Sequence, residues 1–385
     1  MLKLKNHNKR DASSRRHSIE NSMAFSNAPT ELINCHKRTI EVDEEQKQNQ
    51  FLQWARLILP WLTPGELANV SLTCRTLFQI SKSITLCRSL DASRSVENFP
   101  IPFHNAVDQT PYAYFIYTPS QIIPPPCPAQ FPSRQFWAST NAAADAESNS
   151  SLSLLGFDSV SLVCESDESE SGCDCEECFE VGLGDGVFGC PCFSGLEDVG
   201  IVSECGPSCG CGSECGNRLT QRGISVRLKI VRSVNKGWGL YADQFIKQGQ
   251  FICEYAGELL TTKEARWRQQ IYDGLASSPG NSSALLVIRE HLPSGKACLR
   301  MNIDATRIGN IARFINHSCD GGDLSTTLVR SSGSILPRLC FFASKDIKEG
   351  EELAFSYGEI RARPKGLPCY CGSTSCFGIL PSENT

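Results

Sequence analysis

Cysteine is the residue type whose number and spacing most clearly indicate chemistry in this chain. The 385 residues include 21 cysteines, and nine of these lie in two short groups. Zn²⁺ prefers four soft ligands arranged as a tetrahedron, and closely spaced thiolates supply them. The sequence therefore predicts zinc binding by one group of five cysteines and one group of four: Cys173, Cys175, Cys178, Cys190 and Cys192, then Cys205, Cys209, Cys211 and Cys215.

The main alternative for so many cysteines is the disulfide framework of a secreted protein. The first residues, MLKLKNHNKRDASSRRHS, lack the apolar stretch of a signal peptide. The sequence also has no run of 18 apolar residues that would predict a membrane span. Because thiols stay reduced in a protein that is not exported, we expect metal ligands rather than disulfides.

Nine thiolates can be shared among zinc ions in two ways. Three ions need twelve ligand positions, and nine cysteines fill them if three thiolates each bridge two metals. Two separate four-cysteine sites with one spare thiol satisfy the same arithmetic. In either arrangement the sites are closed, so the expected role is structural.

A second, incomplete set of cysteines lies near residue 370. Cys369, Cys371 and Cys376 provide three thiolates, and a tetrahedral site requires a fourth ligand from elsewhere. Cys319 is the candidate. The remaining cysteines are interpreted as small buried hydrophobic residues or spare thiols, and they are Cys35, Cys74, Cys87, Cys127, Cys164, Cys253, Cys298 and Cys340.

Three short motifs follow the nine cysteines in a fixed order. They are KGWGL at 236–240, RFINHSC at 313–319 and ELAFSYG at 352–358. Together they resemble the SET domain of protein lysine methyltransferases, in the suppressor-of-variegation class. The resemblance covers a pre-SET zinc module at 166–225, the SET domain at 226–358 and a post-SET zinc loop at 366–378.

The resemblance implies a zinc arrangement as well as a fold. In this family the nine pre-SET thiolates hold a triangle of three zinc ions, and a cysteine matching Cys319 closes the post-SET site. An all-thiolate cluster carries negative charge, and Arg218 and Arg222 lie close by in sequence as compensation. The implied fold is α+β, with a β-rich SET domain in which the NHSC segment passes through a loop in a knot-like arrangement.

The resemblance also implies the activity, which is methyl transfer from S-adenosylmethionine to a lysine amine. Tyr357 is expected where the cofactor meets the lysine, and Phe355 is the second expected catalytic residue. Phe rather than Tyr at position 355 leaves room for an already methylated amine, which favours di- or trimethylation. The residues expected at the cofactor are Lys236, Gly237, Trp238, Arg313, Phe314, Asn316, His317 and Tyr357.

The chemistry of the reaction explains these residue types. The attacking lysine must be neutral, and deprotonating a group of pKa about 10.4 at pH 7 costs roughly 4–5 kcal/mol. An apolar aromatic channel and a neighbouring sulfonium charge both lower the pKa of that lysine. No strong base is then required, so we expect the rate to come mostly from alignment.

One position departs from the family. Related enzymes place a second tyrosine in a strand after the helix, whereas this chain has Ala284 or a neighbour in that place. Tyr255 and Tyr272 are the candidates that can compensate. Ser356 also replaces a more usual aspartate.

The elements that must position these residues are mostly short strands. Alternating or β-branched runs predict strands within 224–231, 251–260, 299–304 and 339–344, and TTKEARWRQQIYD at 261–273 predicts a helix. Many short strands with one helix favour a β-rich α+β domain.

The residues before the zinc module have a different character. Residues 1–50 are polar and basic at their start, which predicts a disordered tail. Residues 51–100 predict helices, with Thr63 and Glu66 as a capping box, and resemble part of an F-box. A small helical hairpin packed on the rest of the protein is the favoured interpretation, and a ubiquitin-ligase adaptor as partner is the alternative that this resemblance implies. Residues 101–165 predict a linker with ordered aromatic pieces between Tyr112 and Tyr117.

The net charge of the chain indicates which classes of partner it can bind. A formal net charge of -5 provides no overall basic field for nucleic acid, so no direct nucleic-acid site and no membrane contact is expected. The class resemblance implies the histone H3 tail as substrate, lysine 9 as target, chromatin silencing as the process and the nucleus as the location. The alternatives are a methyltransferase of a non-histone protein and a catalytically weak zinc scaffold or adaptor.

Overall fold

The computed structural model describes most of the chain in two compact units, Met1–Trp61 and Leu62–Thr385. In the first unit, residues 49–58 are helical and a 3-10 turn follows at Leu59–Trp61. Most of the expected tail at 1–50 and the later part of the expected linker lie outside the described residues. The described residues are 49–124, 172–176, 178, 190–193, 201–275, 283–291, 298–334, 336–358 and 367–381.

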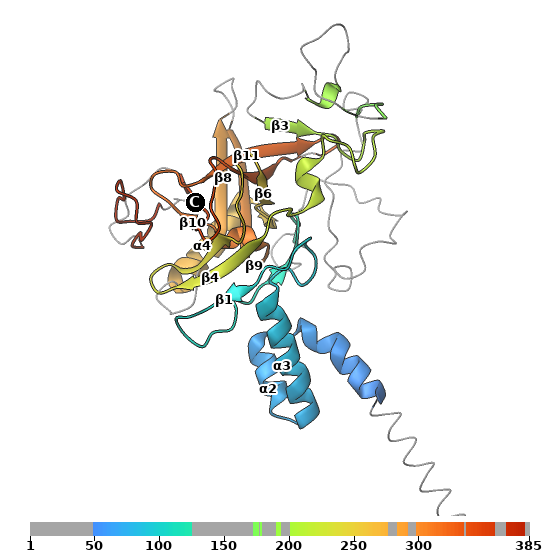
Figure 1. Cartoon of the computed structure of the whole chain (residues 1–385), viewed down its shortest axis with the longest axis vertical. Coiled ribbons are helices and arrows are strands. Elements are labelled where there is room, and N and C mark those ends of the chain that lie inside the picture. The colour runs from blue at the N-terminus through green and yellow to red at the C-terminus, as the bar shows by residue number, and fades with distance from the viewer. Residues whose placement is uncertain are drawn as a thin grey trace, which may run out of the picture. The chain divides into compact units, whose positions relative to one another are not determined.

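The second unit begins with a pair of helices, α2 (Pro64–Ser71) and α3 (Arg75–Leu90), which lie side by side (Figure 1). The predicted capping box is confirmed: Thr63 Oγ1 accepts from the Glu66 N–H, and Glu66 Oε2 accepts from the Thr63 N–H at 2.7 Å. Apolar side chains such as Leu72, which is 84% exposed, remain in contact with solvent. Binding of a ubiquitin-ligase adaptor by these helices stays a prediction.

Short segments after α3 form part of the body that contains the three motifs at 236–240, 313–319 and 352–358. Strand β1 (Phe103–His104) pairs in parallel with β4 (Leu228–Ser233), and β2 (Ile116–Tyr117) pairs in parallel with β9 (Cys298–Gly309). Phe103 and Tyr117 are buried in the main hydrophobic core. This part of the expected linker therefore contributes strands and core residues.

The body contains several small sheets, as the alternation of the sequence predicts. β4 pairs with β5 (Gly237–Ala242), while β9 pairs with β7 (Gly257–Leu260) and with β8 (Leu285–His291). A third sheet has the order β3-β11-β12-β6, which is Ile201–Glu204, Leu324–Ser331, Arg338–Ala343 and Phe251–Glu254. The predicted helix is confirmed as α4 (Thr262–Leu275). In the described residues no helix is long and apolar enough to cross a membrane.

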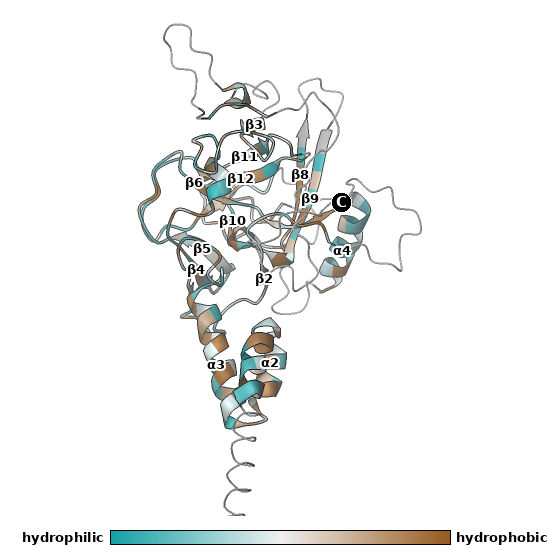
Figure 2. Cartoon of the chain, turned by 90° about the vertical axis from the view of Figure 1, so that its right-hand side faces the viewer, coloured by the Kyte–Doolittle hydropathy of each residue, from teal (hydrophilic) through white to brown (hydrophobic). Residues whose placement is uncertain are grey.

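Figure 2 colours each residue by its hydropathy and shows that hydrophilic residues predominate along α4. The helix α4 has a low mean hydropathy and buries Ala265. Its Arg268 donates to the carboxylates of Glu258 on β7 and Asp304 on β9, at 2.7 Å and 2.8 Å. Because Asp304 is fully buried, this guanidinium supplies the positive charge that its carboxylate requires inside the protein.

A two-stranded parallel ladder joins the two most specific motifs. β10 (Asn316–His317) pairs with β13 (Ala354–Phe355), so that Asn316 lies opposite Ala354 and His317 opposite Phe355. The 313–319 and 352–358 motifs therefore meet in space although they are far apart in the chain.

A buried ionic cluster connects the zinc-module residues to the central sheet. Arg338 on β12 donates to Glu204 at 2.9 Å and to Glu254 at 3.4 Å. Glu204 also accepts from the backbone N–H and the hydroxyl of Thr220, each at 2.8 Å. Burial raises the pKa of Glu254 to about 7, and the charge of Arg338 opposes that rise. The guanidinium therefore holds two buried carboxylates from two parts of the chain.

We predict that Arg338→Met destabilises the protein by about 3 kcal/mol, because it leaves buried carboxylates without their cation. Thermal unfolding of the zinc-loaded protein measures the change. The matched control is Arg232→Met, which removes a partly exposed ion pair with Asp108 and should cost less than about 1 kcal/mol. Equal effects of the two substitutions would contradict the assigned role of Arg338.

Candidate zinc centres and active site

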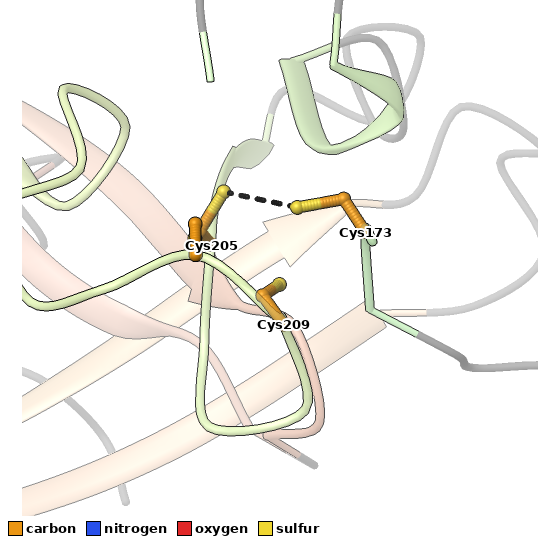
Figure 3. Close-up of side chains that lie close together, drawn as sticks. Cys173, Cys205 and Cys209 are labelled. Atoms are coloured by element: carbon orange, nitrogen blue, oxygen red, sulfur yellow. Dashed lines mark hydrogen bonds between the residues drawn. The ribbon is translucent and has the colours of Figure 1, made fainter. Parts of the chain in front are cut away.

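The nine cysteines converge on one small region beside the end of β3. Figure 3 shows Cys173 and Cys205 with their sulfur atoms facing one another and Cys209 next to them. The sulfur atoms of Cys173 and Cys205 are 3.8 Å apart. The sulfur atom of Cys192 lies 3.7 Å from that of Cys209, and Cys175 packs against the same cluster. Three sets have their sulfur atoms within 4.8 Å of one another: Cys173, Cys205, Cys209 and Cys211; Cys173, Cys178, Cys190 and Cys205; and Cys178, Cys205, Cys211 and Cys215.

The overlap between these three sets distinguishes a cluster with bridging thiolates from two separate zinc sites. Two separate four-cysteine sites would have no cysteine in common. Here Cys205 belongs to all three sets, and Cys173, Cys178 and Cys211 each belong to two. Shared thiolates are what a three-zinc cluster requires, so the geometry favours the triangular arrangement over two separate sites.

Positive charge and N–H donors surround the thiolates. Arg218 donates to Cys211 Sγ at 3.5 Å and to the carbonyl oxygens of Gly206 and Cys211. Asn217 Nδ2 donates to Cys205 Sγ at 3.5 Å. Arg222 donates to backbone carbonyls of the same loop rather than to sulfur. The expected charge compensation is therefore direct for Arg218 and indirect for Arg222.

The second cysteine set is complete once the chain is folded. Cys319, Cys369, Cys371 and Cys376 bring their sulfur atoms within 4.8 Å of one another, and Cys319 Sγ lies 3.7 Å from Cys369 Sγ. The four thiolates fit a tetrahedral zinc site. The fourth ligand thus comes from the RFINHSC motif, which also carries candidate cofactor residues.

Tyr357 is held at both ends by residues of that same motif. Its hydroxyl donates to the Ile315 carbonyl at 2.7 Å, and its backbone N–H donates to His317 Nδ1 at 3.1 Å. Burial raises the pKa of the Tyr357 phenol, so the hydroxyl is protonated at neutral pH. The residue as a whole is 38% exposed, which leaves part of it accessible to a ligand.

A chain of aromatic rings continues from Tyr357 into the core. Phe355 lies between Tyr357 and Phe341, with ring centroids 5.0 Å and 4.8 Å away. Tyr255 follows at 6.4 Å from Phe341, and its hydroxyl donates to the Ala284 carbonyl at 2.7 Å. Tyr255 therefore lies beside the position where the usual second tyrosine is absent.

The other candidate for that position has a different environment. The Tyr272 hydroxyl donates to Asp304 at 2.7 Å, inside the Arg268 cluster. The geometry therefore favours Tyr255 over Tyr272 as the compensating tyrosine.

Glu352 is the residue that the sequence analysis missed. Its two oxygens accept from Lys236 Nζ at 2.7 Å and from Asn316 Nδ2 at 2.8 Å. Asn316 Nδ2 also lies 3.5 Å from the Trp238 carbonyl, and Gly239 leaves the space for these groups. One carboxylate thus joins all three motifs. The available signal was an acidic residue within the same motif as Phe355 and Tyr357.

Arg313 and Phe314 lie against the segment that precedes the zinc module. The Arg313 guanidinium is 4.9 Å from the Phe115 ring centroid and donates to the Thr306 carbonyl. Phe314 contacts Phe103 and Phe115 edge-on, and Phe103 also contacts the Trp238 ring. These contacts show packing, so the expected cofactor contact of Arg313 and Phe314 stays a prediction.

We predict four zinc ions per chain. Cys376→Ser should lower the zinc content by one, because it removes a ligand from the smaller site only. Cys205→Ser should lower the zinc content by more than one, because this thiolate belongs to all three overlapping sets. Elemental analysis of the purified proteins measures both losses, with the exposed Cys74→Ser as control. Loss of a single zinc from Cys205→Ser would contradict the shared cluster.

Comparisons with known proteins agree with this geometry. The SET domain family matches residues 237–358. The histone-lysine N-methyltransferase SUVR3 of Arabidopsis thaliana is 60% identical over 346 residues, which cover 88% of this chain and 93% of the relative.

Two solved structures share the fold. The methyltransferase domain of human SETMAR has a TM-score of 0.51 at 27% identity and covers 76% of this chain and 97% of that one. KRYPTONITE in complex with mCHH DNA, H3(1-15) peptide and SAH also has a TM-score of 0.51 at 27% identity, over 76% of this chain and 53% of that one. The expected fold and cofactor class are confirmed by these likenesses and by the cysteine geometry. The chain belongs to the SET-domain histone-lysine N-methyltransferases, which are S-adenosylmethionine-dependent enzymes.

Proposed function

We propose that this enzyme methylates lysine 9 of histone H3, in the nucleus and in the service of chromatin silencing. The observation that carries the proposal is the β10–β13 ladder, which brings Asn316 and His317 beside Phe355, with the Tyr357 N–H hydrogen-bonded to His317. The choice of substrate is supported by the KRYPTONITE complex, which contains an H3 peptide, and by the nine-cysteine cluster expected for this class.

In this proposal the residues around Glu352 hold the cofactor. Lys236, Gly237 and Trp238 contribute mainly backbone groups, and Asn316 and His317 contact the adenosine part. S-adenosylmethionine supplies the electrophilic methyl group when it is bound. Glu352 keeps Lys236 and Asn316 at fixed positions through its two hydrogen bonds, so that the cofactor pocket is formed before the cofactor arrives.

The aromatic side chains act on the lysine. Phe355 and Tyr357 supply an apolar surface that favours the neutral amine by excluding water. The Tyr357 hydroxyl and nearby carbonyl oxygens orient the amine and make weak C–H···O contacts to the methyl group. Alignment of the nucleophile with the methyl group then provides most of the rate.

No residue near Tyr357 is required as a strong base. His317 is the nearest imidazole, but its two ring nitrogens already contact the Tyr357 N–H and Cys319 Sγ. Burial also lowers the pKa of His317, which keeps the ring neutral at neutral pH. His317 therefore serves in binding and positioning, and the amine proton leaves to solvent before methyl transfer.

The test of this proposal compares two H3(1-15) peptides, one natural and one with arginine in place of lysine 9. The zinc-loaded enzyme with labelled S-adenosylmethionine should label the first peptide and not the second. Tyr357→Phe should lower kcat by about 100-fold, because alignment contributes several kcal/mol to the rate. Label that persists on the arginine peptide would identify another target lysine. Absence of label on H3, together with label on another protein, would identify a non-histone methyltransferase.

Phe355 supports a second prediction about the product. Phe355→Tyr adds a hydroxyl to the channel and removes the space in which a methylated amine turns. We expect the product to shift from di- or trimethyl-lysine toward monomethyl-lysine, as measured by mass spectrometry of the H3 peptide. The control is Phe342→Tyr on β12, because Phe342 packs against Phe251 in a separate cluster. An unchanged product distribution in Phe355→Tyr would contradict the assigned role.

A further inference from the structure

The side chain of His317 joins two parts of the site that are otherwise described separately. Its Nδ1 accepts a hydrogen bond from the Tyr357 backbone N–H at 3.1 Å. Its Nε2 lies 3.3 Å from Cys319 Sγ, one of the four thiolates of the smaller cysteine set. The residue is 5% exposed, so water does not compete strongly for either contact.

The two contacts require the same form of the imidazole ring. A backbone N–H can only donate, so Nδ1 must be the acceptor and the ring hydrogen of the neutral imidazole lies on Nε2. A zinc-bound thiolate can only accept, so it takes that Nε2–H. Hydrogen bonds from outer residues to metal ligands orient the ligands and change metal affinity. Each neighbour of His317 therefore stabilises the tautomer that the other neighbour needs.

The backbone fixes the ring between its partners. His317 lies opposite Phe355 in the β10–β13 ladder, and the Ser318 N–H donates to the Phe355 carbonyl at 3.0 Å. The His317 and Tyr357 ring centroids are 5.2 Å apart. The other anchor of Tyr357 is the hydrogen bond from its hydroxyl to the Ile315 carbonyl. Loss of the Nδ1 acceptor would leave the phenol attached and the Tyr357 backbone less constrained.

We propose that His317 is a positioning residue that couples zinc occupancy of the Cys319 site to the placement of Tyr357. This inference rests on the proposed role of Tyr357 in lysine alignment. It adds a physical link: the hydrogen bond to zinc-bound Cys319 selects the tautomer that holds the catalytic tyrosine. Because coupling between two binding sites is reciprocal, occupation of the active site by cofactor should also slow zinc loss from the Cys319 site.

Two substitutions separate the contacts. The amide oxygen of His317→Asn takes the place of Nδ1 and keeps an acceptor for the Tyr357 N–H. The amide nitrogen of His317→Gln takes the place of Nε2 and keeps a donor for Cys319 Sγ. Each variant thus retains one half of the link, so a merely structural role of His317 would not produce opposite effects.

The experiment measures kcat and KM for the H3 peptide and, separately, the rate at which a colorimetric chelator removes the zinc ion of the Cys319 site, identified as the ion that Cys376→Ser lacks. We expect release from His317→Asn to be about 10-fold faster than from His317→Gln, because the outer-shell donor is lost. We expect kcat of His317→Gln to fall about 10-fold below that of His317→Asn, with KM for the peptide changed little. His104→Asn, an exposed histidine on β1, is the matched control.

The outcomes distinguish this inference from the proposed function. If the wild-type enzyme methylates H3 while the two His317 variants are alike in kcat and in zinc release, the link is wrong and the function stands. If wild-type methylation of H3 fails, the zinc-release arm still tests the contact with Cys319. Should either variant fail to fold, zinc release from wild type is compared with and without S-adenosylmethionine. Equal rates would overturn the coupling, and slower release with cofactor would support it.

Discussion

The parallel pairing of two very short strands is the constraint on which the rest of the site depends. β10 and β13 each contain two residues, Asn316–His317 and Ala354–Phe355. So short a ladder has too few hydrogen bonds to persist alone. It persists because the flanking chain is held elsewhere: Ile311 and Leu353 are fully buried, and Asp323 accepts from the Ala354 N–H at 2.8 Å. The active-site geometry is therefore set by the surrounding core.

Metal-binding residues stabilise this core from two sides. On one side, Cys205 follows directly after Glu204, which bonds Arg338 and Thr220. On the other side, Cys319 follows the ladder and gathers three thiolates from the 369–376 segment. In the C-terminal loop the large apolar side chains of Leu367, Tyr370 and Phe377 are exposed, so bound zinc would replace the missing hydrophobic burial there. The catalytic body thus lies between two regions whose order depends on ligand chemistry.

Local patterns predicted local structure well. Thr63 and Glu66 identified a helix start, TTKEARWRQQIYD identified α4, and the strand expected within 251–260 is present as two strands, β6 and β7. The cysteine spacing predicted the two groups that the structure brings together, and the need for a fourth ligand beside Cys369, Cys371 and Cys376 indicated Cys319. The catalytic motifs were found by resemblance, because spacing alone does not show that Asn316 and Phe355 belong to neighbouring strands. Glu352 was missed because its partners, Lys236 and Asn316, are distant in the chain. Strands β1 and β2 were missed because two residues give no periodicity.

The small strands at 103–104 and 116–117 have a consequence for modular exchange of the catalytic domain. The recognisable SET match covers residues 237–358, yet Phe103 and Phe115 lie against Phe314, and Ile116 pairs with Ile308. A catalytic domain that began at the start of this match, or at Cys173, would lack Phe103 and Phe115 and therefore part of its hydrophobic core. Recombination that moves this catalytic domain into another protein must therefore carry residues 91–122 with it, although a long stretch of sequence separates them from the motifs they support. The folded catalytic domain is thus built from separate stretches of sequence that pack together in space.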